Sequence, residues 1–262
     1  MRAGHYPAKV ELPHIPGRDF SGVVSALGEG AYDFRPGDEV FGVCELPAEG
    51  GYAERIAVRQ EIIARKPGTF SHVECAAAGL AALTALVSIE ETLKLERGET
   101  ILIHGGAGGV AGFAIQLAAH LGARVISTAS ARNHDYVRSL GAHQVIDYRA
   151  QDFTQVVSRC DAVLDTVGGE VTGRSFAVLA PGGRLASIAA GARAPASPRA
   201  DVASLRPNVA RSRARLERVA TLLAAGVFRT PDIAAFPLRE AVAAHRVSEA
   251  RHLRGKLVLQ VR

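Results

Sequence analysis

The sequence has no tryptophan, a single methionine and only three cysteines in 262 residues. Cys44, Cys75 and Cys160 are odd in number and far apart, which excludes a disulfide scaffold and a clustered-cysteine zinc site. Such cysteine usage is typical of a reducing compartment, so we expect a cytoplasmic protein. Aromatic residues make up 5% of the chain, which leaves few rings on which nucleic-acid bases could stack.

Long uncharged apolar runs are also scarce. The longest covers residues 75–89 between Glu74 and Glu90, and it is shorter than the roughly 20 residues that a membrane span needs. The first residues, MRAGHYP, contain no apolar segment of the kind found in a secretory signal. We therefore expect a buried helix over residues 75–89 and no membrane partner.

Charge of either sign is dispersed rather than gathered in long blocks. The chain has 31 Lys and Arg against 26 Asp and Glu, for a net charge of +5. A net positive charge favours nucleic acid as a partner, but in this chain the arginines are spread along the sequence. The one dense stretch, residues 206–218, is interpreted as a solvated helix face, so no nucleic-acid partner is expected.

Residues 1–67 form short strand-like runs separated by turns. The runs cover residues 21–24, 38–42 and 52–58, and the turns lie at Pro16-Gly17, Pro36-Gly37 and Gly50-Gly51. This pattern predicts a small, mostly antiparallel β unit.

From residue 68 onward, apolar strands alternate with helical segments, as in βαβ units. This alternation predicts an α/β fold with a doubly wound Rossmann parallel sheet. The predicted strands cover 100–104, 123–128, 144–147, 162–165 and 184–188, and the predicted helices cover 71–93, 134–140, 153–159 and 172–179. Two amphipathic helices, 209–225 and 238–250, and a closing strand, 256–261, follow.

A glycine-rich segment, GGAGGVAG at 105–112, lies between the strand that ends at His104 and the next helix. Gly106-x-Gly108-x-x-Ala111 fits the dinucleotide fingerprint, which accepts Gly or Ala at its third position. Glycines let the backbone approach a diphosphate, and the helix N-terminus supplies free N–H groups. A mononucleotide P-loop is disfavoured because no Gly-Lys-Ser/Thr follows.

The second strand indicates which dinucleotide would bind. NAD sites place an acidic residue roughly 20 residues after the glycines, whereas arginine accommodates the 2′-phosphate of NADP. Here the first acidic residue after the glycines is Asp135, which follows the end of the strand. Ser130 and Arg132 lie before it and supply hydroxyl and guanidinium donors. The sequence therefore predicts NADP(H) as the cofactor.

Motifs along the whole chain resemble the medium-chain dehydrogenase/reductase superfamily, in its zinc-independent, zeta-crystallin-like NADPH:quinone oxidoreductase branch. These motifs are IPGRDFSGVV at 15–24, PGDEVFG at 36–42, GGYAE at 50–54, LTA at 83–85, the segment 104–111, LDTVGG at 164–169, PGGR at 181–184 and GKLVL at 255–259.

The resemblance implies a split domain organisation. A GroES-like β domain would comprise residues 1–67 and the C-terminal return, 226–262, with a Rossmann domain of residues 68–225 between them and the active site in the cleft. Relatives commonly form homodimers through the edges of their Rossmann sheets. Family members begin with additional strands and an Asn-Pro segment, so the chain resembles an N-terminally shortened form.

The resemblance also assigns roles to individual residues. Tyr6 would orient substrate or donate a proton. Apart from the resemblance, Asp165 is interpreted as a helix cap rather than a catalyst. The implied cofactor-binding residues are Gly106, Ala107, Gly108, Gly109 and Val110 at the diphosphate, Ser130 and Arg132 at the 2′-phosphate, Tyr148 near the adenosine, Gly168 and Gly169 along the cofactor, Thr84 near the nicotinamide and Arg251 as a second phosphate contact.

No metal site is expected. The zinc-dependent branch carries Gly-His-Glu where this chain has Gly17-Arg18-Asp19, and a cysteine ligand where Leu80 stands. Neither arginine nor leucine can ligate zinc. The histidines at 104, 134 and 245 are interpreted as surface or capping residues.

The remaining chemistry is hydride transfer, because the sequence has no Gly-x-Ser-x-Gly elbow or catalytic cysteine signature. The expected activity is reduction of a quinone or another small α,β-unsaturated carbonyl by NADPH. Two alternatives stay open: an enoyl-thioester reductase of the same fold, and a non-catalytic NADPH-binding protein that lacks the N-terminal active-site segment.

Overall fold

The computed structural model describes residues 11–189, 191, 193–250 and 253–261. Contacts divide the chain into two compact units. We call Thr84–Val209 the central unit, and Met1–Leu83 together with Ala210–Arg262 the split unit. Each unit is described separately below.

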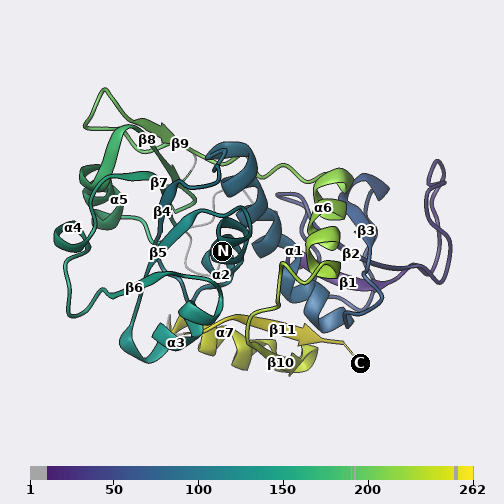
Figure 1. Cartoon of the computed structure of the whole chain (residues 1–262). Helices are drawn as coiled ribbons and strands as arrows, with labels where there is room; N and C mark the ends of the chain where they lie inside the picture. Colours follow the sequence, from purple (N-terminus) through teal and green to yellow (C-terminus); the bar gives the residue numbers. More distant parts are fainter. Residues whose placement is uncertain (1–10, 190, 192, 251–252, 262) are drawn as a thin grey trace. The chain divides into compact units, whose positions relative to one another are not determined.

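The central unit contains a six-stranded sheet in which every neighbouring pair of strands is parallel (Figure 1). Its strands, in spatial order, are β6 (Gln144–Asp147), β5 (Arg124–Ala129), β4 (Thr100–Ile103), β7 (Cys160–Asp165), β8 (Leu179–Ser187) and β9 (Ala203–Leu205). The chain runs outward from β4 through β5 to β6, then crosses back to β7 on the other side of β4. This order confirms the doubly wound Rossmann class.

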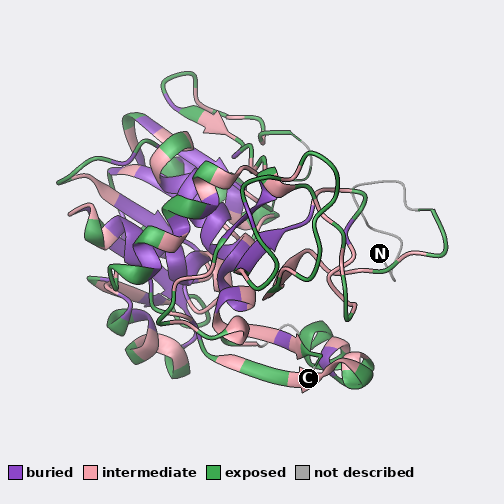
Figure 2. Cartoon of the chain, turned by 90° about the vertical axis from the view of Figure 1, so that its right-hand side faces the viewer, coloured by how far each residue is buried: buried purple, intermediate pink, exposed green. Residues whose placement is uncertain are grey.

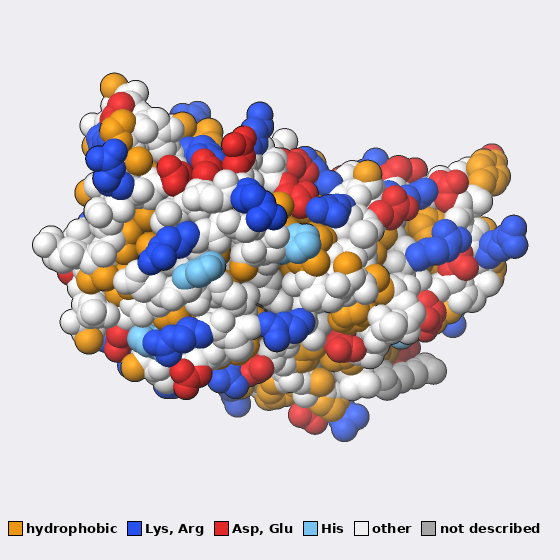
Figure 3. All heavy atoms as spheres, in the orientation of Figure 1, with side chains coloured by type: hydrophobic (Ala, Val, Ile, Leu, Met, Phe, Trp, Pro, Cys, Tyr) orange, Lys and Arg blue, Asp and Glu red, His pale blue; other side chains and the backbone are white. Residues whose placement is uncertain are grey.

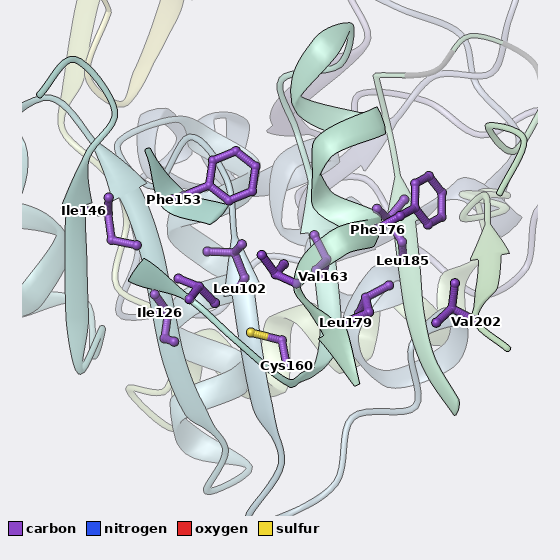
Figure 4. Close-up of a cluster of buried hydrophobic side chains, with 12 residues drawn as sticks. Leu102, Ile126, Ile146, Phe153, Cys160, Val163, Phe176, Leu179, Leu185 and Val202 are labelled. Carbon is purple, nitrogen blue, oxygen red and sulfur yellow. The ribbon is translucent and has the colours of Figure 1, made fainter. Parts of the chain in front are cut away.

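Helices pack on this sheet because their apolar faces match its apolar strands. α2 (Gly109–His120) contacts β4 and β5, α3 (His134–Ser139) contacts β5 and β6, and α5 (Glu170–Ser175) contacts β7 and β8. α4 (Phe153–Val156) follows β6. The middle strands β4, β5 and β7 are largely buried, as the purple strands of Figure 2 show. Figure 4 shows Leu102, Val163 and Leu185 side by side in one apolar cluster.

The predicted buried helix is observed as α1 (His72–Leu86), which continues into the π-helical η2 (Val87–Thr92). It begins with a capping box, in which Ser71 N donates to Glu74 Oε2 at 2.8 Å and Glu74 N donates to Ser71 Oγ at 3.2 Å. Among the described residues it is the one helix long and apolar enough to cross a membrane. However, 72% of its apolar window is buried inside the protein, as in a core helix.

The split unit contains two small sheets. β1 (Asp19–Val23), β2 (Glu39–Val43) and β3 (Ile63–Arg65) form an antiparallel sheet in that order. The short helix η1 (Gln60–Ile62) lies directly before β3 in the chain. β10 (Ile233–Pro237) and β11 (Lys256–Gln260) form a parallel pair, with η5 (Leu238–Glu240) and α7 (Ala241–Glu249) between them. The predicted strand over residues 52–58 was wrong: this segment is a loop, and β3 takes the place beside β2.

The prediction that the arginines of residues 206–218 lie on a solvated face was wrong for Arg213. On α6 (Arg213–Ala224), Arg213 Nη1 lies 2.7 Å from Asp33 Oδ2, and Nη2 donates to the carbonyl of Gln60 at 2.7 Å. Its guanidinium also lies 4.9 Å from the centroid of the Phe34 ring. These contacts attach α6 to the split unit, although the sequence placed residues 68–225 together in the Rossmann domain.

A hollow of about 1710 Å³ lies within the split unit. β1 and β11 both line it, together with residues 51–58 and the start of α1. Within the described part of the chain, β1 pairs only with β2 and β11 pairs only with β10. The hollow is therefore bordered by strands whose second edge carries no strand partner.

Charged side chains are dispersed over the face shown in Figure 3. Lys and Arg side chains alternate there with Asp and Glu, so this face carries no continuous basic patch.

Candidate cofactor-binding site

The carboxyl ends of β4, β5, β6 and β7 lie at one edge of the central sheet, because the four strands are parallel neighbours. In open α/β sheets this edge is where ligands bind. The loops that follow these strands bring together Gly106, Ala107, Gly108, Gly109, Val110, Ser130, Arg132, Tyr148, Gly168 and Gly169.

The loop after β4 is tight enough to require glycine. Gly105 has a φ of +73°, which favours glycine, and Gly108 N donates to its carbonyl at 2.8 Å. A Cβ on Gly106 would lie 2.3 Å from Ser127 Oγ. The first two glycines therefore shape the loop, and Gly108 becomes the N-cap of α2.

The N-terminus of α2 fits an anionic group. Within the described part of the chain, no side chain caps this helix, and its first turn contains no acidic residue. The first intrahelical bond runs from Gly112 N to the carbonyl of Gly108 at 2.9 Å, so the amides of residues 109–111 have no intrahelical acceptor. Free amides and the positive end of the helix dipole suit a diphosphate.

The β5 loop carries Ser130, the N-cap residue of the short helix η3 (Ala131–Asn133), and Arg132 within that helix. Ser130 is buried, and its Oγ accepts from Asn133 Nδ2 at 3.3 Å, whereas Arg132 is exposed. The next acidic residue, Asp135, has a fully exposed side chain that pairs with Arg138 at 3.0 Å. Along the loop, the Ser130 hydroxyl and the Arg132 guanidinium therefore come before the first carboxylate, that of Asp135.

Tyr148 directly follows β6 and is 55% exposed. The guanidinium of Arg149 lies 5.8 Å from the centroid of its ring. The ring is thus an exposed flat surface beside a cation at the same edge of the sheet.

Asp165 organises the loop that holds Gly168 and Gly169. Its buried carboxylate accepts from the backbone amides of Val167 and Gly168, both at 2.9 Å. It also accepts from the hydroxyls of two further residues, Ser187 at 3.1 Å and Thr172. The prediction that Asp165 is a helix cap was wrong, because Gly169 is the N-cap of α5.

The prediction that His104 lies at the surface or caps a helix was also wrong. Its side chain is 1% exposed, and its imidazole packs edge-on against Phe153 with the centroids 4.7 Å apart. Burial lowers the pKa of His104 to about 4, with Asp165 opposing and Arg174 adding to the shift. The imidazole is therefore neutral at physiological pH.

Thr128, at the end of β5, is a residue that the sequence analysis did not assign to the site. Its carbonyl accepts from Gly106 N at 2.9 Å, and its Oγ1 accepts from Gly105 N at 3.1 Å. The available signal was its position as the last polar residue of a strand beside the glycine loop.

Three other predicted residues do not belong to these loops. Thr84 is buried on α1 in the central unit, and its carbonyl accepts from Ser88 Oγ at 2.7 Å. Tyr6 and Arg251 lie outside the described residues.

The positions that correspond to zinc ligands in the related branch are adjacent in the split unit. Leu80 N donates to Asp19 Oδ1, and Arg18 Nε lies 3.0 Å from Glu49 Oε1. The described residues contain no group of three or more His, Cys, Asp or Glu side chains that could hold a metal ion. Because arginine and leucine have no suitable donor atoms, these positions do not fit zinc.

Comparison with known families agrees with this architecture. Residues 1–96 match the alcohol dehydrogenase GroES-like domain, and residues 140–259 match the family described as zinc-binding dehydrogenase. The zinc in that description does not fit Arg18 and Leu80, which stand where the related branch has its zinc ligands.

Individual relatives are oxidoreductases. A quinone oxidoreductase from Sus scrofa is 30% identical over 279 residues, which cover 99% of this chain and 83% of that protein. An NADPH-dependent alkenal/one oxidoreductase from Arabidopsis thaliana is 35% identical over 185 residues, 68% of this chain. The match covers 47% of the plant protein, so the chain spans about half of that relative's length.

A solved structure is similar as well. The Escherichia coli quinone oxidoreductase complexed with NADPH superposes with a TM-score of 0.88 and is 28% identical, covering 99% of this chain and 86% of that one. The chain therefore belongs to the medium-chain dehydrogenase/reductase superfamily, in its quinone oxidoreductase branch.

Proposed function

We propose that the protein is an NADPH-dependent oxidoreductase that reduces a quinone or a small α,β-unsaturated carbonyl. The observation that carries the proposal is the uncapped N-terminus of α2, placed by a tight glycine loop at the carboxyl edge of a Rossmann sheet. Its membership in a family of quinone and enone reductases supports the same reaction.

The residues present fit the cofactor. The backbone of residues 106–110 would bind the diphosphate, while Ser130 and Arg132 would bind the 2′-phosphate. Tyr148 would cover the adenosine, and Gly168 and Gly169 would lie along the cofactor. Thr84 would lie near the nicotinamide, and Arg251 would add a second phosphate contact.

NADPH, when bound, supplies the hydride, and the chain supplies position and electrostatics. A conjugated acceptor suits a site without a metal ion, because conjugation spreads the negative charge that develops on the carbonyl oxygen. That oxygen then needs a hydrogen-bond donor, and the reduced product needs one proton in addition to the hydride. For both we propose the Tyr6 hydroxyl, which would regain its proton from solvent. Replacing Tyr6 by phenylalanine should lower kcat with little change in NADPH affinity; unchanged turnover would remove Tyr6 from the chemistry.

Cofactor choice is tested by titrating the wild-type chain and the Arg132→Glu variant with NADPH and NADH. The wild type should bind NADPH at least about tenfold more tightly, and the variant should lose this preference, because a carboxylate repels the 2′-phosphate. Tighter binding of NADH to the wild type would overturn the assignment.

The reaction is tested by following NADPH absorbance with quinones, enones and enoyl thioesters as acceptors. Turnover of quinones or enones is the expected result. Turnover of thioesters alone would favour an enoyl-thioester reductase, and NADPH binding without oxidation of any acceptor would favour a non-catalytic binding protein.

We further propose that the protein acts in the cytoplasm as a homodimer. The reduced state expected of its three buried cysteines supports that compartment. Sedimentation equilibrium of the purified chain tests the dimer.

A further inference from the structure

His104 is a buried polar side chain to which the proposed chemistry gives no role. It directly follows β4, where the glycine loop begins. Each of its ring nitrogens lies within hydrogen-bond distance of a hydroxyl: Nδ1 is 3.2 Å from Thr128 Oγ1, and Nε2 is 3.0 Å from Ser175 Oγ.

The direction of these hydrogen bonds follows from Ser175. Its hydroxyl donates its only proton to the carbonyl of Val171 at 2.7 Å, so Ser175 Oγ must accept from His104 Nε2–H. The proton of the neutral imidazole is thus on Nε2, and Nδ1 is left as an acceptor. Thr128 Oγ1 donates to that acceptor.

The same Thr128 holds the start of the glycine loop. With its proton directed to His104, Oγ1 presents its lone pairs to Gly105 N at 3.1 Å. The Thr128 carbonyl accepts from Gly106 N at 2.9 Å. A continuous chain of hydrogen bonds therefore runs from Val171 on α5, through Ser175, His104 and Thr128, to the loop.

We infer that His104 is a positioning residue of the cofactor site: its Nε2–H tautomer orients the Thr128 hydroxyl, which accepts from Gly105 N. This bond fixes the start of the glycine loop, so that the amides that follow it are held in place for the dinucleotide diphosphate. The inference rests on the proposed function, because it concerns the affinity of the same site. An apolar side chain of similar size would fill the space but would leave the Thr128 hydroxyl without its buried acceptor.

Three variants separate positioning from packing. His104→Leu removes both ring contacts, whereas His104→Asn retains an acceptor at the distance of Nδ1 from the backbone. Thr128→Val removes the hydroxyl and keeps the shape of the side chain. The matched control is His143→Leu, because His143 also contacts β5, accepting from Val125 N at 3.1 Å, but at the opposite end of the strand.

The first measurement is the Kd of each purified full chain for NADPH, by fluorescence titration. His104→Leu and Thr128→Val should raise Kd about tenfold, as expected for one lost buried hydrogen bond. His104→Asn should stay within about threefold of the wild type, and His143→Leu should match it. An unchanged Kd in His104→Leu, or equal losses in His104→Leu and His104→Asn, would overturn the inference.

The second measurement is nitrogen-15 NMR of the wild type and of Thr128→Val, which does not depend on a bound cofactor. The wild-type imidazole should show a protonated Nε2, and the amide signals of Gly105 and Gly106 should shift in Thr128→Val. A protonated Nδ1 would overturn the inference even if His104→Leu failed to fold. Absence of NADPH binding by the wild type would overturn the proposed function and this inference together, whereas the other outcomes address the inference alone.

Discussion

The central unit and the split unit bury their strands to different extents. β7 lies between two parallel neighbours and is buried along nearly its whole length, whereas β10 has one parallel neighbour and is nowhere fully buried (Figure 2). Parallel sheets are almost always covered on both faces, and only the central unit meets this condition among the described residues. The split unit instead encloses a large hollow beside β1 and β11.

This difference bears on function because the proposed diphosphate site lies wholly in the well-packed unit. A glycine loop can hold its amides in place only if the strands and helices beneath it are rigid. Tyr6 and Arg251, by contrast, belong in sequence to the split unit. The comparison therefore predicts that cofactor binding is a property of the central unit and resists perturbation of the other.

The largest expected effect is a difference in local stability between the two units. Amides of β4 and β7 should open with a free energy about 5 kcal/mol greater than amides of β10 and β11, because the latter strands have few buried side chains. Native-state hydrogen exchange with mass spectrometry measures both in one experiment. Equal protection of the two units would show that the difference in burial does not control opening.

The second prediction compares one carboxylate from each unit. Asp165→Ala should lower the free energy of unfolding by about 4 kcal/mol, because four donors lose a fully buried acceptor. In the split unit, Asp33→Ala removes an ion pair with Arg213. Because the Asp33 side chain is 53% exposed, this change should lower the free energy of unfolding by less than about 1 kcal/mol. Urea unfolding measures both, and equal losses would contradict the comparison.

The third prediction concerns pH. His104 has a pKa of about 4 when folded, against 6.5 for an unperturbed histidine, so between these values the unfolded chain binds a proton that the folded chain does not. The free energy of unfolding should therefore fall by about 3 kcal/mol as the pH drops through this range. Relative to His104→Asn, which lacks the titrating group, the stability of the wild type should decline by this amount. A difference independent of pH would contradict it.

The sequence predicted the glycine loop and five of the six strands of the central sheet, because these depend on local patterns, but it missed β9, which has three residues. Alternating apolar strands and helices define the order of elements, and Gly106 and Gly108 occur at fixed spacing before an amphipathic helix. Short strands were harder: β3 has three residues, and β10 ends in Pro237, which removes a backbone donor. The loop over residues 52–58 has the alternation of a strand but does not pair.

Two of the side chains that the sequence misplaced, those of His104 and Arg213, have partners distant in the chain. The buried His104 is hydrogen-bonded to Ser175, which lies 71 residues later in the chain. Arg213 forms an ion pair with Asp33, which lies 180 residues earlier. A histidine or an arginine on its own favours an exposed interpretation, because burial costs free energy unless hydrogen bonds replace those to water. No local pattern in the sequence reports such partners.

The smallest expected effect compares one glycine from each unit. A Cβ on Gly106 would lie 2.3 Å from Ser127 Oγ, which cannot move freely because it donates to the carbonyl of Ile103 at 2.7 Å. Gly106→Ala should therefore cost about 2 kcal/mol of stability and weaken NADPH binding.

Gly22 on β1 is the matched control, because a Cβ there would have no atom within 4 Å, and its φ lies outside the left-handed region. Gly22→Ala should change the free energy of unfolding by less than about 0.5 kcal/mol and leave the Kd for NADPH unchanged. Thermal unfolding and cofactor titration of the two variants complete the comparison. If Gly106→Ala were as mild as Gly22→Ala, the loop would not be tight, and a close approach of its backbone to the diphosphate would need another explanation.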